Sequence, residues 1–404
     1  MTPEIATVDE KQAKLAFDGD AAEVFALAMK TGALTFLTLG IYRFWAKTRM
    51  RRYFWSRTRL NGQGFEYTGT GLEKFLGFLV AVVVLAVYLA IVQVILFLLG
   101  MRFTFRPTTE AEMLAQLALF YASALAVLPL VYFATYRSRR YRMSRSKFRG
   151  IRLGMASEAW AYTGRAVIYL VLAIVTLGIL HPLMRFRLEK FMTDRTFYGD
   201  ARLVQGGNWT GLYWSMRHIF IAVLILVLAV VATAITRGPG LGILFGIVGF
   251  AWLIVGLFSY YVQGFGYMTC CKRLETADGS RIAFAAAPQT GTVFKHYFLG
   301  GLAVGLAAST AFGFVGLLSQ SLFDPSGQSS QIPVLVVGAL GYVAALIVIG
   351  AVQLTLVTRP VIGHMITTIT ILDAEPLDTV RQRVGEGSAD ADGFAEALDV
   401  GGAF

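Results

Sequence analysis

The sequence predicts an all-α polytopic membrane protein with six to eight transmembrane or re-entrant helices, a tandem internal duplication and small cytoplasmic β-hairpins. Of its 404 residues, 56% are hydrophobic and 15% are charged, whereas soluble domains carry about 25% charged residues. The apolar residues gather in runs of about 20 or more, which is the length that crosses a bilayer. The duplication is visible because Leu37-Thr38-Leu39-Gly40-Ile41 recurs 138 residues later as Val175-Thr176-Leu177-Gly178-Ile179.

The charge distribution supports the membrane assignment. Six apolar runs contain no Lys, Arg, Asp or Glu: 75–100, 113–136, 218–236, 239–264, 296–323 and 332–358. The net charge of +11 therefore describes loops at a membrane surface, and it does not indicate nucleic-acid binding. The two cysteines, Cys270 and Cys271, are neighbours, so they give neither a disulfide framework nor zinc-ligand spacing.

The order of polar and apolar segments predicts five parts: a soluble N-terminal arm (1–21), membrane repeat 1 (22–157), membrane repeat 2 (158–290), a third transmembrane helix pair (291–358) and an acidic C-terminal tail (359–404). Each repeat opens with one short apolar segment and continues with two long runs. Glycines in the basic loops predict four small surface hairpins, with turns at Gly62, Gly150, Gly199 and Gly279.

Lysine and arginine counts predict the topology. Segments 43–74, 137–165 and 183–217 hold eight, nine and six cations, whereas the linkers inside the three helix pairs hold two, one and none. The positive-inside rule places the basic segments in the cytoplasm, which gives six crossings. Segments 22–42 and 158–182 then begin and end on the same side. Either they are re-entrant or surface-lying, or they cross and the total is eight.

Two cations lie within these short apolar segments, Lys30 and Arg165. They either line a polar cavity that attracts an anionic substrate or lipid headgroup, or reach back to the membrane interface. Glycine pairs four residues apart predict close packing of a helix on its neighbour in two runs: Gly242 with Gly246, and Gly301 with Gly305.

The first basic loop interleaves cations with aromatic residues. Its candidate interface residues are Arg43, Trp45, Lys47, Arg49, Arg51, Arg52, Arg57 and Arg59. This composition is typical of a topology determinant that anchors anionic lipid, and it also suits a site for a phosphate-bearing ligand. The acidic tail either docks on the basic loops through Phe394, Leu398 and Phe404 or stays solvated. The predicted partners are anionic membrane lipids and a second copy of the chain, without nucleic acid.

The same block carries a family resemblance. Leu37-Thr-Leu-Gly-Ile-Tyr42-Arg-Phe-Trp45-Ala-Lys47-Thr-Arg49, followed by Thr58-Arg-Leu-Asn-Gly62-Gln-Gly-Phe65-Glu-Tyr67-Thr-Gly69-Thr-Gly71, resembles the bacterial YjgN family, also called the DUF898 domain family. Phe17-Asp-Gly19 with Phe25 is similar to the start of the family, and 393–401 is similar to its end. The resemblance implies a multi-pass protein of the bacterial inner (cytoplasmic) membrane without an assigned activity. It implies no catalytic residue.

The sequence therefore leaves two functions open. The first is a transporter or channel for an anionic or amphipathic solute, which the duplication and the candidate re-entrant segments favour. The second is a non-catalytic membrane scaffold or interaction protein that binds anionic lipid or partner proteins. A membrane enzyme is a weaker third, because no catalytic triad, phosphate loop or paired carboxylates are present, and no cofactor or metal is predicted.

Overall fold

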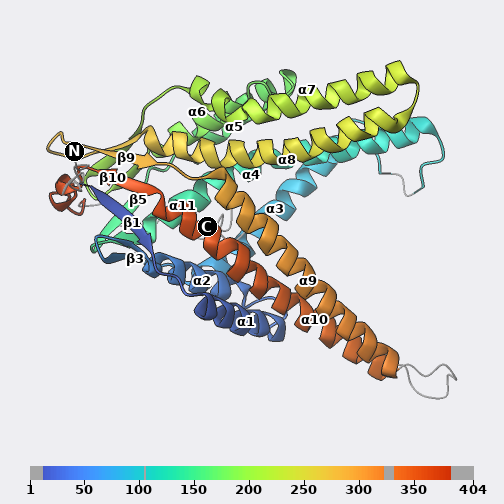
Figure 1. Cartoon of the computed structure of the whole chain (residues 1–404), viewed down its shortest axis with the longest axis horizontal. Coiled ribbons are helices and arrows are strands. Elements are labelled where there is room, and N and C mark those ends of the chain that lie inside the picture. The colour runs from blue at the N-terminus through green and yellow to red at the C-terminus, as the bar shows by residue number, and fades with distance from the viewer. Residues whose placement is uncertain (1–11, 104–105, 323–331, 384–404) are drawn as a thin grey trace, which may run out of the picture. The chain divides into compact units, whose positions relative to one another are not determined.

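The computed structural model describes residues 12–103, 106–322 and 332–383 (Figure 1). Contacts between residues divide the chain into two compact units, and each is described by itself. The first unit comprises residues 1–66 and 205–379, and the second comprises residues 67–204 and 380–404.

The prediction of an all-α fold is wrong. Ten short strands lie between the helices in the part of the chain that the structure describes. The first unit has an antiparallel sheet in the order β3-β2-β1-β10-β9-β8, formed by Gln63–Tyr67, Thr58–Leu60, Ala13–Phe17, Ile369–Leu372, Arg281–Ala286 and Lys272–Glu275. The second has the order β4-β5-β6-β7, formed by Ser146–Phe148, Ile151–Met155, Thr196–Tyr198 and Ala201–Gln205.

Local and distant pairings together explain the error. The four glycine turns join β2 to β3, β4 to β5, β6 to β7 and β8 to β9, and Gly62 and Gly150 both have φ of +77°. Such turns favour glycine, which has no Cβ, and the sequence shows them. The pairing of Ala13 with Ile371 joins the two ends of the chain, and no local pattern of residues indicates it. Isolated hairpins thereby become parts of larger sheets.

Eleven α-helices occur among the described residues. The first unit contains α1 (Ala21–Leu37), α2 (Arg43–Arg57), α7 (Leu212–Thr236), α8 (Pro239–Cys270), α9 (Thr290–Leu322), α10 (Ile332–Gln353) and α11 (Arg359–Thr367). The second contains α3 (Gly71–Leu98), α4 (Glu110–Ser144), α5 (Ala159–Val175) and α6 (His181–Thr193). Six stretches in the described part are long and apolar enough to cross a membrane; they correspond to α3, α4, α7, α8, α9 and the continuous α10–α11 segment.

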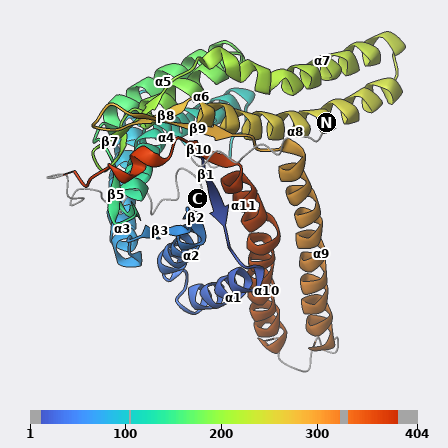
Figure 2. The same cartoon turned by 60° about the vertical axis from the view of Figure 1, so that its left-hand side comes forward.

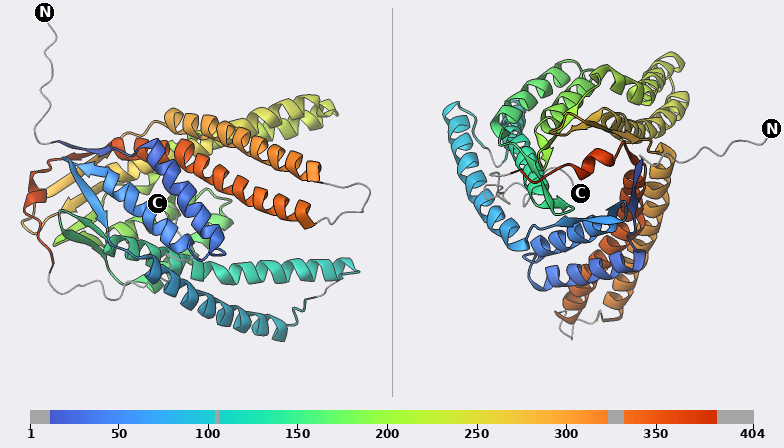
Figure 3. Two further views of the ribbon diagram at one scale, coloured as in Figure 1. Left: turned by 90° about the horizontal axis from the view of Figure 1, so that it is seen from below. Right: turned by 90° about the vertical axis from the view of Figure 1, so that its left-hand side faces the viewer.

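The long helices form antiparallel pairs. In Figure 2, α9 lies alongside α10, and both views of Figure 3 show α7 beside α8. The pair α3–α4 in the second unit extends in the same way, with the Tyr88 hydroxyl donating to the Ala126 carbonyl at 2.7 Å (Figure 3). Each of these hairpins starts and ends at strands. The Thr68 amide donates to the Arg145 carbonyl at 2.8 Å and so closes the α3–α4 excursion at its base.

The short apolar segments also form hairpins that return to their starting point. Phe17 at the end of β1 pairs with Thr58 at the start of β2, so the α1–α2 hairpin begins and ends at adjacent strands. Met155 of β5 pairs with Thr196 of β6 and closes the α5–α6 hairpin in the same way. Helices α1 and α5 have 17 residues each, or about 26 Å, and are shorter than the six long apolar stretches.

The duplication is visible element by element. Strand β1, helices α1 and α2, and strands β2 and β3 start at residues 13, 21, 43, 58 and 63, and β5, α5, α6, β6 and β7 start 138 residues later. The turns between the short helices are also alike. The Gly40 amide donates to the Thr35 carbonyl and the Gly178 amide to the Ala173 carbonyl, both at 2.7 Å.

Glycines with a spacing of seven residues bring α7 and α8 close together. Gly242, Gly249 and Gly256 are buried, and a Cβ on Gly256 would lie 2.9 Å from the Ile219 backbone nitrogen. Of the predicted pairs, Gly242 packs closely on its neighbour, whereas a Cβ on Gly246, Gly301 or Gly305 meets nothing within 4 Å. A seven-residue spacing keeps one face of a helix toward its partner in a left-handed crossing, which a four-residue spacing does not sustain.

The start of the C-terminal tail lies against the turn between β6 and β7. The Asp200 amide donates to the Arg381 carbonyl at 2.9 Å, and the Arg381 amide donates to the Asp200 carboxylate at 3.0 Å. The Arg152 amide donates to the Gln382 side chain at 2.8 Å. The predicted anchors Phe394, Leu398 and Phe404 lie outside the described residues.

We expect Gly199→Ala to release this segment. Gly199 has φ of +56°, and a Cβ there would lie 2.3 Å from the Arg381 carbonyl oxygen. Trypsin should therefore cleave after Arg381 faster in the variant than in the unaltered chain. Gly150→Ala is the matched control, because Gly150 also has positive φ but open space around its Cβ. Equal cleavage rates in the two variants would show that the contact with Gly199 does not hold the tail.

Candidate functional site

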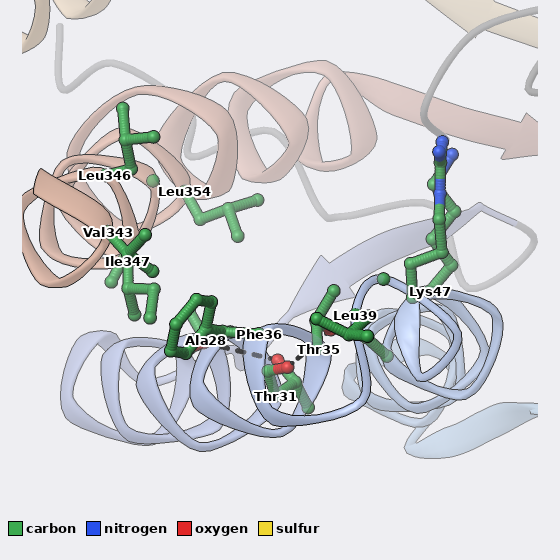
Figure 4. Close-up of a pocket in the computed structure, with 16 residues that line it drawn as sticks. Ala28, Thr31, Thr35, Phe36, Leu39, Lys47, Val343, Leu346, Ile347 and Leu354 are labelled. Carbon is green, nitrogen blue, oxygen red and sulfur yellow. Dashed lines mark hydrogen bonds between the residues drawn. The ribbon is translucent and has the colours of Figure 1, made fainter. Parts of the chain in front are cut away.

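An open groove of about 540 Å³ lies within the first unit, between α1, the start of α2, α10 and the residue that follows α10. Figure 4 shows its side chains, with those of α10 on one side and those of α1 on the other. The groove is lined by Ala28, Thr31, Gly32, Thr35, Phe36, Leu39, Gly40, Arg43, Ala46, Lys47, Val343, Leu346, Ile347, Gly350, Ala351 and Leu354.

Helices α1 and α10 run antiparallel along the groove. Gly32 allows their close approach, because a Cβ there would lie 2.8 Å from Cγ2 of Ile347. One turn toward the sheet, Ala28 and Ala351 share a buried cluster with Met50 of α2. The α1 residues that line the groove recur every three or four positions, which places them on one face of the helix.

The two threonines in the groove do not make its wall polar. The Thr31 hydroxyl donates to the Leu27 carbonyl and the Thr35 hydroxyl donates to the Thr31 carbonyl, both at 2.7 Å (Figure 4). These donors are satisfied within α1, so the threonine methyl groups and the side chains of α10 give the groove an apolar wall.

Helix α2 supplies the two cations of the groove. Arg43 and Lys47 are four residues apart, so they lie on the same side of α2. Arg43 is exposed and Lys47 is half-buried. In Figure 4, Lys47 lies at one end of the labelled side chains, away from Val343 and Ile347. The groove thus combines an apolar body with a cationic end.

The other residues of the predicted basic and aromatic interface lie outside this groove. Exposed Arg49 lies over the Tyr42 ring at 5.5 Å, and Trp45 stacks on the same ring at 6.2 Å. Arg51 is buried with its guanidinium 5.8 Å from the Trp55 ring, and Arg52 is exposed.

Two further arginines of that interface hold the base of the α1–α2 hairpin. Arg57 forms an ion pair with Glu23 at 2.6 Å, and Arg59 pairs with Asp18 at 3.3 Å. The first pair is 33% and 48% exposed, so its main effect is on geometry. Arg195, which is 138 residues after Arg57, pairs with Glu158 at 2.7 Å at the base of the second hairpin.

The two predicted intramembrane cations are not among the residues that line the groove. Lys30 is exposed on α1 and lies on a different face from Thr31 and Thr35. Arg165 is exposed on α5, and its guanidinium lies 4.5 Å from the Phe191 ring. Sequence reasoning missed the α10 wall of the groove, because Val343, Ile347 and Gly350 look like any other residues of an apolar run.

A second cavity of about 610 Å³ lies in the second unit beside the start of α5. Its cations already have partners within the unit: Arg140 donates to the Met155 carbonyl and the Ser157 hydroxyl, both at 3.2 Å, and Arg137 lies over the Phe133 ring at 5.7 Å. Among the described residues, no group of three or more His, Cys, Asp or Glu could hold a metal ion. The groove of the first unit is therefore the stronger candidate site.

The six long apolar stretches define a polytopic integral membrane protein. Residues 12–272 match the family described as "Bacterial protein of unknown function (DUF898)", and the chain belongs to this family. It is similar to proteins named "Inner membrane protein YjgN", with 23% identity over 214 residues for Salmonella typhimurium and 24% over 216 residues for Escherichia coli O157:H7.

The matches with these relatives are partial. They cover 52% and 50% of this chain and 49% and 54% of the relatives, so the chain spans about half the length of the curated relatives it matches. No solved structure matches the chain. The predicted family and the location in the bacterial inner membrane, as a multi-pass protein, are confirmed by these relatives and the long apolar helices.

Proposed function

We propose that this inner-membrane protein binds an anionic amphiphile in the groove between α1, α2 and α10, as a non-enzymatic step in its transport. The apolar wall with Arg43 and Lys47 at one end carries the proposal. A hydrocarbon chain would lie along α1 and α10, and an anionic phosphate or carboxylate head would meet the two cations. A groove open to its surroundings lets such a ligand enter sideways, which suits a ligand that is dissolved in the bilayer.

Charge supplies the first test. A cation near an anionic headgroup contributes about 1 kcal/mol, so replacing two should weaken binding roughly 30-fold. The full chain in an uncharged detergent is titrated with phosphatidylglycerol or phosphatidylcholine, and its thermal stability is measured. Phosphatidylglycerol should stabilise the unaltered chain more, and Arg43→Gln with Lys47→Gln should remove that difference.

The matched control is Arg49→Gln with Arg52→Gln. This pair makes the same change of net charge on the same helix, but neither residue lines the groove. The control should keep the preference for phosphatidylglycerol. Equal losses in both double variants would contradict a groove site, and would favour the alternative of a scaffold whose basic helix holds anionic lipid without a defined site.

Occlusion supplies the second test. Gly350 lines the groove, and a Cβ there meets nothing within 4 Å, so Gly350→Leu fills the groove without a backbone clash. We expect weaker stabilisation by phosphatidylglycerol and slower movement of a fluorescent phosphatidylglycerol analogue across reconstituted vesicles. Gly301→Leu on α9 is the control, since its Cβ also has open space and it lies outside the groove. Unchanged binding in Gly350→Leu would contradict the site, and unchanged movement with weakened binding would contradict transport.

A further inference from the structure

Leucine occupies an unfavourable backbone conformation at the tip of each short helical hairpin. Among the described residues, six that are not glycine have positive φ. Four of them are polar: Asn61, Arg149, Arg237 and Asp373. The other two are Leu39 and Leu177, both at φ of 50° and both in the turns that follow α1 and α5. A Cβ makes this left-handed conformation costly, and short polar side chains tolerate it better than leucine.

Packing within the chain does not explain the leucines. Leu39 is 92% exposed and Leu177 is 93% exposed. Their neighbours are apolar and exposed as well: Leu37 and Ile41 at the first tip, Val175 and Ile179 at the second. Exposed apolar patches of this kind mark contact with another apolar phase. We propose that the two Thr-Leu-Gly turns insert into the hydrocarbon of the bilayer as the tips of re-entrant helical hairpins.

The register of α1 on α10 gives the depth of the first tip. Gly32 faces Ile347, and the two helices run antiparallel. Leu39, seven residues further along α1, is therefore level with about residue 340 of α10. That position is about 20 Å along α10 from its end at Gln353. A hydrocarbon core is about 30 Å thick, so the first tip lies within it without crossing it.

The second hairpin has the same relation to α4. The Arg140 guanidinium contacts the Ser157 hydroxyl at 3.2 Å, and the Tyr136 and Tyr162 rings are 5.4 Å apart. Leu177 lies 15 residues beyond Tyr162, and so is level with about residue 121, within the predicted span Glu110–Ser144. This level is about 22 Å along α4 from Tyr136. Two hairpins with unlike side chains therefore place a leucine tip at a similar depth.

The cations of the hairpins fit this placement. The same registers set Lys30 level with residue 349 of α10 and Arg165 level with residue 133 of α4, about 5–6 Å from the base in each case. Long cationic side chains at this level reach the headgroups. Helices α2 and α6 are rich in cations and require a polar environment. The apolar tips and helices α1 and α5 thus face acyl chains, whereas α2 and α6 do not.

A depth measurement tests the inference independently of any ligand in the groove. Cys270 and Cys271 are replaced by Ala in the full chain, and a nitroxide is attached to Leu39→Cys or Leu177→Cys. The protein is reconstituted in vesicles of phosphatidylcholine and phosphatidylglycerol, and collisions with oxygen and with a water-soluble nickel chelate are measured. Both tips should show a several-fold higher ratio of oxygen to nickel collisions than the controls Asn61→Cys and Arg149→Cys.

The controls are matched because Asn61 and Arg149 are also exposed turn residues with φ near 50°. They lie in the turns between β2 and β3 and between β4 and β5, where we expect water. A ratio at Leu39 and Leu177 equal to that of the controls would overturn the inference. A high ratio at one tip alone would overturn it as a property of the repeat. Circular dichroism of each labelled variant verifies that its helices are retained.

Discussion

Tyr136→Ala is expected to lower the free energy of unfolding by about 3–5 kcal/mol, the range for removing a large buried ring. Tyr136 is fully buried in the second unit, where its ring lies 5.4 Å from that of Tyr162 and 6.1 Å from that of Phe191. These rings come from α4, α5 and α6, so the cavity would open where the short hairpin packs on the long helix. Thermal unfolding in detergent measures the loss.

Two companion variants separate the contributions. The Tyr136 hydroxyl donates to the Ala156 carbonyl at 2.7 Å, so Tyr136→Phe should cost only about 1 kcal/mol. Tyr121→Ala removes a ring that is 62% exposed on the same helix and should leave the stability in detergent nearly unchanged. If Tyr136→Ala were no more harmful than Tyr121→Ala, the described packing of α5 and α6 on α4 would be wrong.

Gly256→Leu is expected to separate α7 from α8. A Cβ at this position would lie 2.9 Å from the Ile219 nitrogen and 3.0 Å from the His218 carbonyl carbon. Backbone atoms cannot rotate away as a side chain can, so the helices must shift along their whole contact. We expect a loss of about 2–3 kcal/mol, at the upper end of the range for overpacking, measured as a lower midpoint of thermal unfolding in detergent.

Gly246→Leu is the control on the same helix. A Cβ on Gly246 meets nothing within 4 Å, and replacing a helical glycine by leucine raises helix propensity by roughly 0.8 kcal/mol. The control should therefore be as stable as the unaltered chain or slightly more stable. A comparable loss in both variants would show that helix packing does not depend on the seven-residue glycine spacing.

The groove illustrates how far residue patterns reach. Its cations, Arg43 and Lys47, belong to the predicted basic interface, because cations interleaved with aromatic residues are visible along the chain. Its wall was not predicted, since Ile347 and Gly350 differ in no local way from other residues of the apolar runs. A spatial relation across some 300 residues depends on which helix packs against which, and composition does not encode that choice.

The sequence by itself determined the membrane class, the duplication, the family and the position of four hairpin turns. Charge-free runs of sufficient length, a repeated pentapeptide and glycines that require positive φ are local signals, because each depends on residues within a few positions. Tertiary structure alone decided that the turns join strands of larger sheets and that the short apolar segments fold back as hairpins. The pairings of Phe17 with Thr58 and of Ala13 with Ile371 fix both features. Backbone hydrogen bonds of this kind connect distant residues without regard to their side chains, so the sequence carries no mark of them.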